Sequence, residues 1–165
     1  MFTNPLLRFM EKFYGWIISL FSKCQSALLF LLRITWGHQF FLIGLKKFHG
    51  MEGVIQLFDS WHVPFPHFAA PLVATLEVVG GTALVLGLGS RFFALLLSIV
   101  MFTAYGTAHV HAFKDFHFVF NPGLLVQEAP FPFLLTCLIV LTFGPGKVSL
   151  DGWLKRWKEQ KQKYG

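Results

Sequence analysis

The chain of 165 residues contains few charged side chains and few cysteines. Charged residues make up 13% of it, about half of the fraction in an ordinary soluble domain. Its two cysteines, Cys24 and Cys137, form no C-x-x-C pair, and their predicted depths differ by more than a disulfide spans, so a thiol-oxidising enzyme is excluded. The chain also lacks an internal repeat, which argues against a transporter built from inverted repeats.

Apolar residues are abundant instead, at 55% of the chain, and they gather into four long segments. At about 1.5 Å per residue, each segment is long enough to cross a hydrocarbon core of roughly 30 Å, and only helices satisfy their backbone groups there. The last segment begins irregularly, because it contains Pro130 and Pro132. The sequence therefore predicts an all-α membrane protein, a four-transmembrane-helix bundle over residues 26–146, with spans at Ser26–Leu45, Phe68–Leu88, Phe92–Phe113 and Gln127–Phe143.

Two amphipathic segments flank this predicted bundle. A stripe about 120° wide on residues 1–25 holds Asn4, Arg8, Glu11, Lys12, Gly15, Ser19, Ser22 and Lys23, which predicts an interfacial helix. No small-residue cleavage site marks a signal peptide. Residues 147–165 form a basic tail in which apolar side chains recur at helical spacing, namely Leu150, Trp153, Leu154 and Trp157. We expect this tail to lie on an anionic membrane surface.

The basic residues are distributed unevenly around the predicted spans. Ten Lys and Arg lie before the first span, in the loop between the second and third spans, or after the fourth. The other two loops contain three: Lys46, Lys47 and Lys114. Basic residues stay cytoplasmic, so both termini are predicted to lie inside. The net charge of +6 is thus explained by orientation and lipid contact, not by nucleic-acid binding.

Two ionisable residues, Arg33 and Glu77, lie within the apolar segments. Charges at that depth are costly and usually face a partner or a cavity. Arg33 shares a helical face with Gly37, Phe40, Gly44 and Lys47, and Glu77 shares one with Gly80 and Gly81. The small residues on these faces favour close helix packing. The predicted depths agree within roughly 3 Å, so we expect the two charges to meet. They form either an ion pair that fixes packing or a site for a proton, quinone or substrate.

Seven histidines are the second signal, and all lie away from the predicted cytoplasmic half. Imidazole binds metals and relays protons, so a copper, zinc or haem site is one interpretation, with His38, His109 and His111 as its ligands. The spacing supports it weakly, because His109 and His111 are two residues apart and should point to opposite sides of a helix. His109 shares a helical face with Tyr105, which adds both to the ligand-binding candidates.

The order of these features resembles the DoxX family of four-span bacterial membrane proteins, from about residue 26 to 155. The first span reads Leu-Arg-Ile-Thr-Trp-Gly-His-Gln-Phe-Phe-Leu-Ile-Gly-Leu-Lys-Lys-Phe (32–48). The second contains Leu-Glu-Val-Val-Gly-Gly (76–81) before Gly-Leu-Gly-Ser-Arg-Phe (87–92), and the fourth ends Phe-Gly-Pro-Gly-Lys-Val-Ser-Leu-Asp (143–151). Glu128 looks like the acidic residue that many relatives carry before the fourth span. The resemblance implies a multi-pass protein of a bacterial inner membrane.

The resemblance also implies a redox-linked function. Some relatives are the membrane subunit of a thiosulfate:quinone oxidoreductase, others associate with thiol-stress proteins, and one branch accompanies biosynthesis of copper-binding modified peptides. By resemblance, this chain is a small redox-linked membrane subunit that works with partner proteins. Our leading hypothesis is that it binds a quinone or small substrate between its first two spans, with the ligand-binding candidates Arg33, Glu77, Tyr105, His109 and Glu128. Two alternatives stay open: a non-catalytic scaffold, and a copper or haem protein. The glycine-rich faces would also permit a homo-oligomer.

Overall fold

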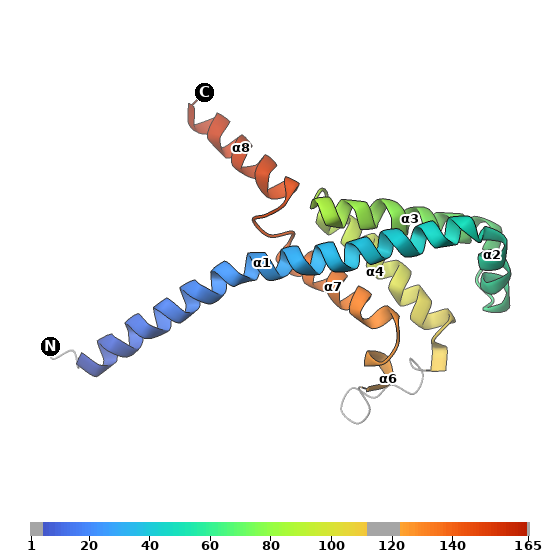
Figure 1. The fold of residues 1–165 in the computed structure, drawn as a ribbon, viewed down its shortest axis with the longest axis horizontal. Helices are drawn as coiled ribbons and strands as arrows, with labels where there is room; N and C mark the ends of the chain where they lie inside the picture. Colours follow the sequence, from blue (N-terminus) through green and yellow to red (C-terminus); the bar gives the residue numbers. More distant parts are fainter. Residues whose placement is uncertain (1–4, 112–122, 165) are drawn as a thin grey trace.

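The computed structural model describes residues 5–111 and 123–164, and every element in that part is a helix (Figure 1). Among these described residues, three helices are long and apolar enough to cross a membrane: α1 (Pro5–His49), α3 (Pro66–Leu86) and α4 (Ser90–Thr107). The apolar α7 (Pro130–Phe143) has 14 residues, about 21 Å, which is short of a full hydrocarbon core. The prediction of an all-α membrane protein is confirmed, and the count of four spans stays a prediction. The remaining elements are α2 (Met51–Ser60), α6 (Gly123–Val126) and α8 (Leu150–Tyr164).

Helix α1 is about twice as long as a single span. Its 45 residues extend about 68 Å, and its N-terminal half projects away from the other helices in Figure 1. Large apolar side chains are exposed there, including Phe9, Trp16 and Phe21. The boundary proposed at residue 25, between an interfacial helix and the first span, therefore falls inside one continuous helix.

The C-terminal half of α1 packs antiparallel along α3 (Figure 1). Gly37 lies against Gly81, and two turns further on Gly44 lies against Ala74 and Val78. A Cβ atom added at Gly44 would stand 2.7 Å from Val78 Cγ2 and 2.8 Å from the Ala74 carbonyl oxygen. The two backbones approach this closely because no side chain separates them, which is how small residues promote helix association in lipid.

Helices α4 and α7 complete the core against α1 and α3. The buried cluster contains Phe40, Leu84, Ala94, Leu97, Val100, Met101, Cys137 and Val140. Cys137 is fully buried there while Cys24 is exposed on α1, and neither forms a disulfide. Both are therefore free thiols, and Cys137 fills space in the core.

Helix α2 corresponds to a segment that was predicted as a loop. Met51, Val54, Ile55 and Phe58 follow the i, i+3, i+4, i+7 spacing of an amphipathic helix, and all four are half-buried. The acidic residues Glu52 and Asp59 are exposed beside this face. With ten residues, α2 is too short to span the membrane, and it packs instead against α3.

At the opposite end of the bundle, the link between α7 and α8 packs on the turn between α3 and α4. Gly87 ends α3 with φ = 72°, and a Cβ atom there would stand 2.5 Å from Ser149 Cβ. The Asp151 carboxylate accepts hydrogen bonds from the backbone N–H groups of Gly89 (2.9 Å) and Ser90 (3.1 Å), where α4 begins. These bonds satisfy donors that a helix N-terminus otherwise leaves unpaired. We call this end of the bundle the terminal side and the other the α2 side.

Candidate functional site

Arg33 is buried on the terminal side and bonds only to backbone carbonyls among the described residues. Its Nε donates to Leu84 (2.8 Å) and its Nη2 to Val85 (3.2 Å), both in the last turn of α3. Its Nη1 donates to Val148 (3.1 Å) and to Pro145 in the link between α7 and α8. The carbonyls of a last helical turn lack helical partners and carry partial negative charge, so they suit a cation. Arg33 thus connects α1 to the last turn of α3 and to the link between α7 and α8.

Glu77 lies on the α2 side and bonds to Lys47, not to Arg33. Its Oε1 is 2.6 Å from Lys47 Nζ, and the Glu77 side chain is 2% exposed against 23% for Lys47. The prediction that Arg33 and Glu77 meet is wrong. Arg33 stands opposite Val85, which is eight residues along α3 from Glu77 (85 minus 77), or about 12 Å.

The two charges were expected at the same depth because the first span was predicted to begin at Ser26. Counting inward from Ser26 placed Arg33 at mid-depth, but α1 already runs for many residues before Ser26. The glycine contacts fix the register instead, and they put Arg33 level with the end of α3. Lys47 shares the packed face of α1 with Gly44, and this spacing was the signal that could have identified it as the partner of Glu77.

A small cavity adjoins the Lys47–Glu77 pair. It measures about 160 Å³ and is lined by Phe40, Ile43, Lys47, Glu77, Met101, Ala129, Pro130 and Phe133. The Phe40 and Phe133 rings meet edge to face with centroids 4.7 Å apart, and Trp36 contacts Phe133 at 4.9 Å. An apolar cavity of about 150 Å³ holds a benzene ring, so this one is large enough for a small cyclic molecule.

Glu77 lines this cavity, and the hydrogen bonding of its second carboxylate oxygen is unusual. Glu77 Oε2 is buried and has no hydrogen-bond partner among the described residues. Buried polar atoms are nearly always bonded, since leaving one unpaired costs free energy. Because Glu77 also lines the cavity, a small movement of its side chain would let this oxygen bond to a ligand or a proton donor there.

The remaining predicted residues form a second cluster on the α2 side. The Tyr105 hydroxyl donates to the Leu125 carbonyl at 2.8 Å. His109 Nδ1 is 2.6 Å from Glu128 Oε2, and His111 Nε2 is 3.2 Å from Glu128 Oε1. The expectation that the two histidines point apart is wrong, because α4 ends at Thr107 and helical spacing no longer relates them. Glu128 directly precedes Ala129 and Pro130, which line the cavity.

The metal alternative gains little from this arrangement. Within residues 5–111 and 123–164, no group of three His, Cys, Asp or Glu side chains is placed to hold a metal ion. His38 is exposed on α1, and His117 lies outside the described residues. Copper or haem binding by His38, His109 and His111 therefore stays a hypothesis.

Three apolar helices, with buried ionisable side chains between them, define a multi-helix integral membrane protein. The chain belongs to the DoxX family, whose sequence model matches residues 28–110. This match includes Arg33, Lys47 and Glu77.

Three curated relatives extend the likeness beyond the family match. The protein named "Putative oxidoreductase CatD" from Bacillus subtilis is 32% identical over 129 residues, covering 78% of this chain and 88% of its own. "Inner membrane protein YphA" from Escherichia coli is 29% identical over 133 residues, covering 79% and 93%. An "Uncharacterized protein" from Haemophilus influenzae is 31% identical over 134 residues, covering 78% and 83%. No solved structure matches the chain. The family and the YphA name indicate a bacterial membrane protein.

Proposed function

We propose that this protein is a redox-linked membrane subunit that binds a quinone headgroup, or a small substrate of similar shape, in the cavity beside Lys47 and Glu77. The observation that carries the proposal is that Glu77 lines an apolar cavity and has a buried oxygen, Oε2, without a hydrogen-bond partner among the described residues. The name of the Bacillus relative, an oxidoreductase, supports the redox assignment.

The Lys47–Glu77 pair suits both redox forms of such a ligand. A lysine ammonium carries three donors, and Glu77 Oε1 occupies one of them, so two remain for a carbonyl oxygen. The free Glu77 Oε2 can accept a hydrogen bond from a hydroxyl of the reduced form. The rings of Phe40 and Phe133 supply an apolar wall for a planar ring. The proposal assigns headgroup binding to this chain and electron transfer to a partner protein in the membrane.

The test is titration calorimetry of the purified protein in detergent with a short-chain benzoquinone. Lys47→Met removes the charged donor and should weaken binding about 10-fold to 100-fold, since a hydrogen bond to a charged group contributes about 1.5–3 kcal/mol. The matched control is Lys46→Met, which removes the same charge from an exposed neighbour. Equal affinity in the wild type and Lys47→Met, or equal loss in both variants, would contradict the proposal.

A scaffold subunit without a site of its own is the second candidate, and Arg33 favours it. A buried charge that bonds only to backbone carbonyls, as Arg33 does among the described residues, holds segments together and needs no ligand. The double variant Lys47→Met/Glu77→Met separates the two functions. If the protein is a scaffold, the double variant still binds its partner proteins, and its quinone titration equals that of the wild type. If it is the proposed subunit, the double variant keeps its fold but no longer binds the quinone.

A further inference from the structure

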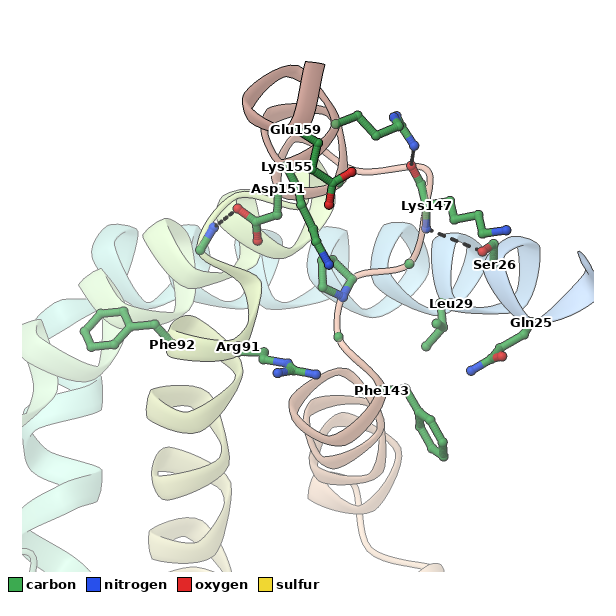
Figure 2. Close-up of a pocket in the computed structure, with 16 residues that line it drawn as sticks. Gln25, Ser26, Leu29, Arg91, Phe92, Phe143, Lys147, Asp151, Lys155 and Glu159 are labelled. Atoms are coloured by element: carbon green, nitrogen blue, oxygen red, sulfur yellow. Dashed lines mark hydrogen bonds between the residues drawn. The ribbon is translucent and has the colours of Figure 1, made fainter. Parts of the chain in front are cut away.

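A second and much larger cavity opens on the terminal side of the bundle (Figure 2). It measures about 1020 Å³ and lies between the middle of α1, the start of α4, the end of α7 and the first turns of α8. It is separate from the Lys47–Glu77 cavity and shares no lining residue with it.

The charges around this cavity are mostly positive. Arg91, Lys147, Lys155 and Arg156 line it, against only two acidic residues, Asp151 and Glu159. The Asp151 carboxylate is already bonded to two N–H groups at the start of α4. The side-chain amines of Lys147 and Lys155 have no partner in the part of the chain that the structure describes. The cavity therefore presents free cations to an anionic ligand.

The cavity is also continuous with apolar surface. Phe92 at the start of α4 and Phe143 at the end of α7 both line it, and they are 62% and 61% exposed. The exposed faces of the same two apolar helices continue with Leu95, Ile99, Leu135 and Leu138. A ligand with an anionic head and apolar chains matches both the basic cavity and the apolar faces of α4 and α7 beside it. A free anion would match only the basic cavity.

We propose that this cavity binds the phosphate headgroup of an anionic phospholipid, with Lys147, Lys155 and Arg91 as its cationic contacts. The acyl chains lie past Phe92 and Phe143 along α4 and α7. Basic pockets between membrane helices on the cytoplasmic side are a known means of holding such headgroups. Figure 2 shows Lys155 reaching from α8 toward the cavity, and Arg156 Nη1 donates to the Lys147 carbonyl at 3.1 Å. The lipid thus lies where α8 joins the bundle.

Native mass spectrometry of the purified protein in detergent tests the proposal. The protein is titrated with phosphatidylglycerol or with phosphatidylcholine of the same acyl chains. We expect phosphatidylglycerol to bind at least about tenfold more tightly. Lys147→Ala/Lys155→Ala should weaken phosphatidylglycerol binding by about 30-fold, from two lost basic contacts, and weaken phosphatidylcholine binding less, because its choline cation offsets the phosphate charge.

The matched control is Lys158→Ala/Lys161→Ala, which removes two positive charges from α8 at positions that do not line the cavity. It should change phosphatidylglycerol binding by less than about threefold. Equal losses in the two double variants would overturn the proposal, because they would show general attraction of the tail to the membrane surface. Equal binding of the two lipids by the wild type would overturn it as well.

Inorganic phosphate supplies the last arm of the experiment. If it binds the wild type as tightly as phosphatidylglycerol does, and depends equally on Lys147 and Lys155, the site takes a free anion and the lipid proposal fails. If the double variant does not fold, Lys155→Gln alone, at an exposed position, should still weaken phosphatidylglycerol binding about fivefold. None of these readouts involves a quinone, so they are independent of the function proposed for the Lys47–Glu77 cavity.

Discussion

Two buried charges at opposite ends of the helix pair α1–α3 have different surroundings. Arg33, on the terminal side, bonds to carbonyls from two separate segments and adjoins packed backbone. Glu77, on the α2 side, has one oxygen bonded to Lys47 and the other without a partner among the described residues, beside a cavity. A charge with most of its hydrogen-bonding groups paired stabilises the fold, while a charge with an unpaired oxygen, on a residue that lines a cavity, is available to a ligand. Variants on the two sides test this difference.

The largest effect is expected at Arg33. Arg33→Ala removes the Arg33 donors from the carbonyls of Leu84, Val85 and Val148, of which Leu84 still accepts from the Gly87 N–H, so the free energy of unfolding should fall by about 3–5 kcal/mol. Arg33→Lys should recover only part of this loss, because one ammonium cannot reach carbonyls on both segments as the guanidinium fork does. Thermal unfolding in detergent measures both variants, and a Lys variant as stable as the wild type would show that the fork is unnecessary.

A bulky residue at Gly44 should lower both the stability of the α1–α3 pair and the affinity for the quinone. Gly44→Val places its Cβ atom 2.7 Å from Val78 Cγ2 and pushes α1 away from α3, which should cost about 1–3 kcal/mol. Because Lys47 lies about one turn further along α1, its contact with Glu77 should be lost, and quinone binding with it. Gly15→Val is the control, since a Cβ atom there meets nothing within 4 Å. Equal melting temperatures for the two variants would show that α1 and α3 are not held as tightly as the glycine contacts indicate.

At Glu77, stability and binding should separate. Glu77→Gln keeps the side chain's shape and an oxygen that can accept from Lys47, so the free energy of unfolding should change by no more than about 1 kcal/mol. The loss of the carboxylate acceptor should still weaken binding of the reduced, hydroxyl-bearing form at least about tenfold. Glu52→Gln, on the exposed face of α2, is the matched control. A Gln variant that unfolds as readily as Arg33→Ala would make Glu77 a structural residue like Arg33.

The helix positions followed from the sequence, and the partners of the charges did not. Apolar segments at Phe68–Leu88 and Phe92–Phe113 predicted α3 and most of α4, because apolar length is what the bilayer selects. Pairing depended on helix register, which Gly37, Gly44 and Gly81 determine through contacts between distant segments. Depth counted from the apparent start of a span could not supply it, since α1 continues beyond the bundle.

The smallest effect is expected at Asp151, which lies close to the Arg33 region but at the surface of the fold. Asp151→Ala removes the acceptor for the N–H groups of Gly89 and Ser90, and losing such a cap costs about 1 kcal/mol. Glu159→Ala removes the same charge from α8 without touching α4, so it should leave the melting temperature unchanged. The α7–α8 link also accepts a hydrogen bond from Arg33, at Val148. If Asp151→Ala lowers the free energy of unfolding as much as Arg33→Ala does, the cap and the guanidinium stabilise one cooperative unit. A small loss would mean that Arg33 is the main residue that stabilises the terminal side.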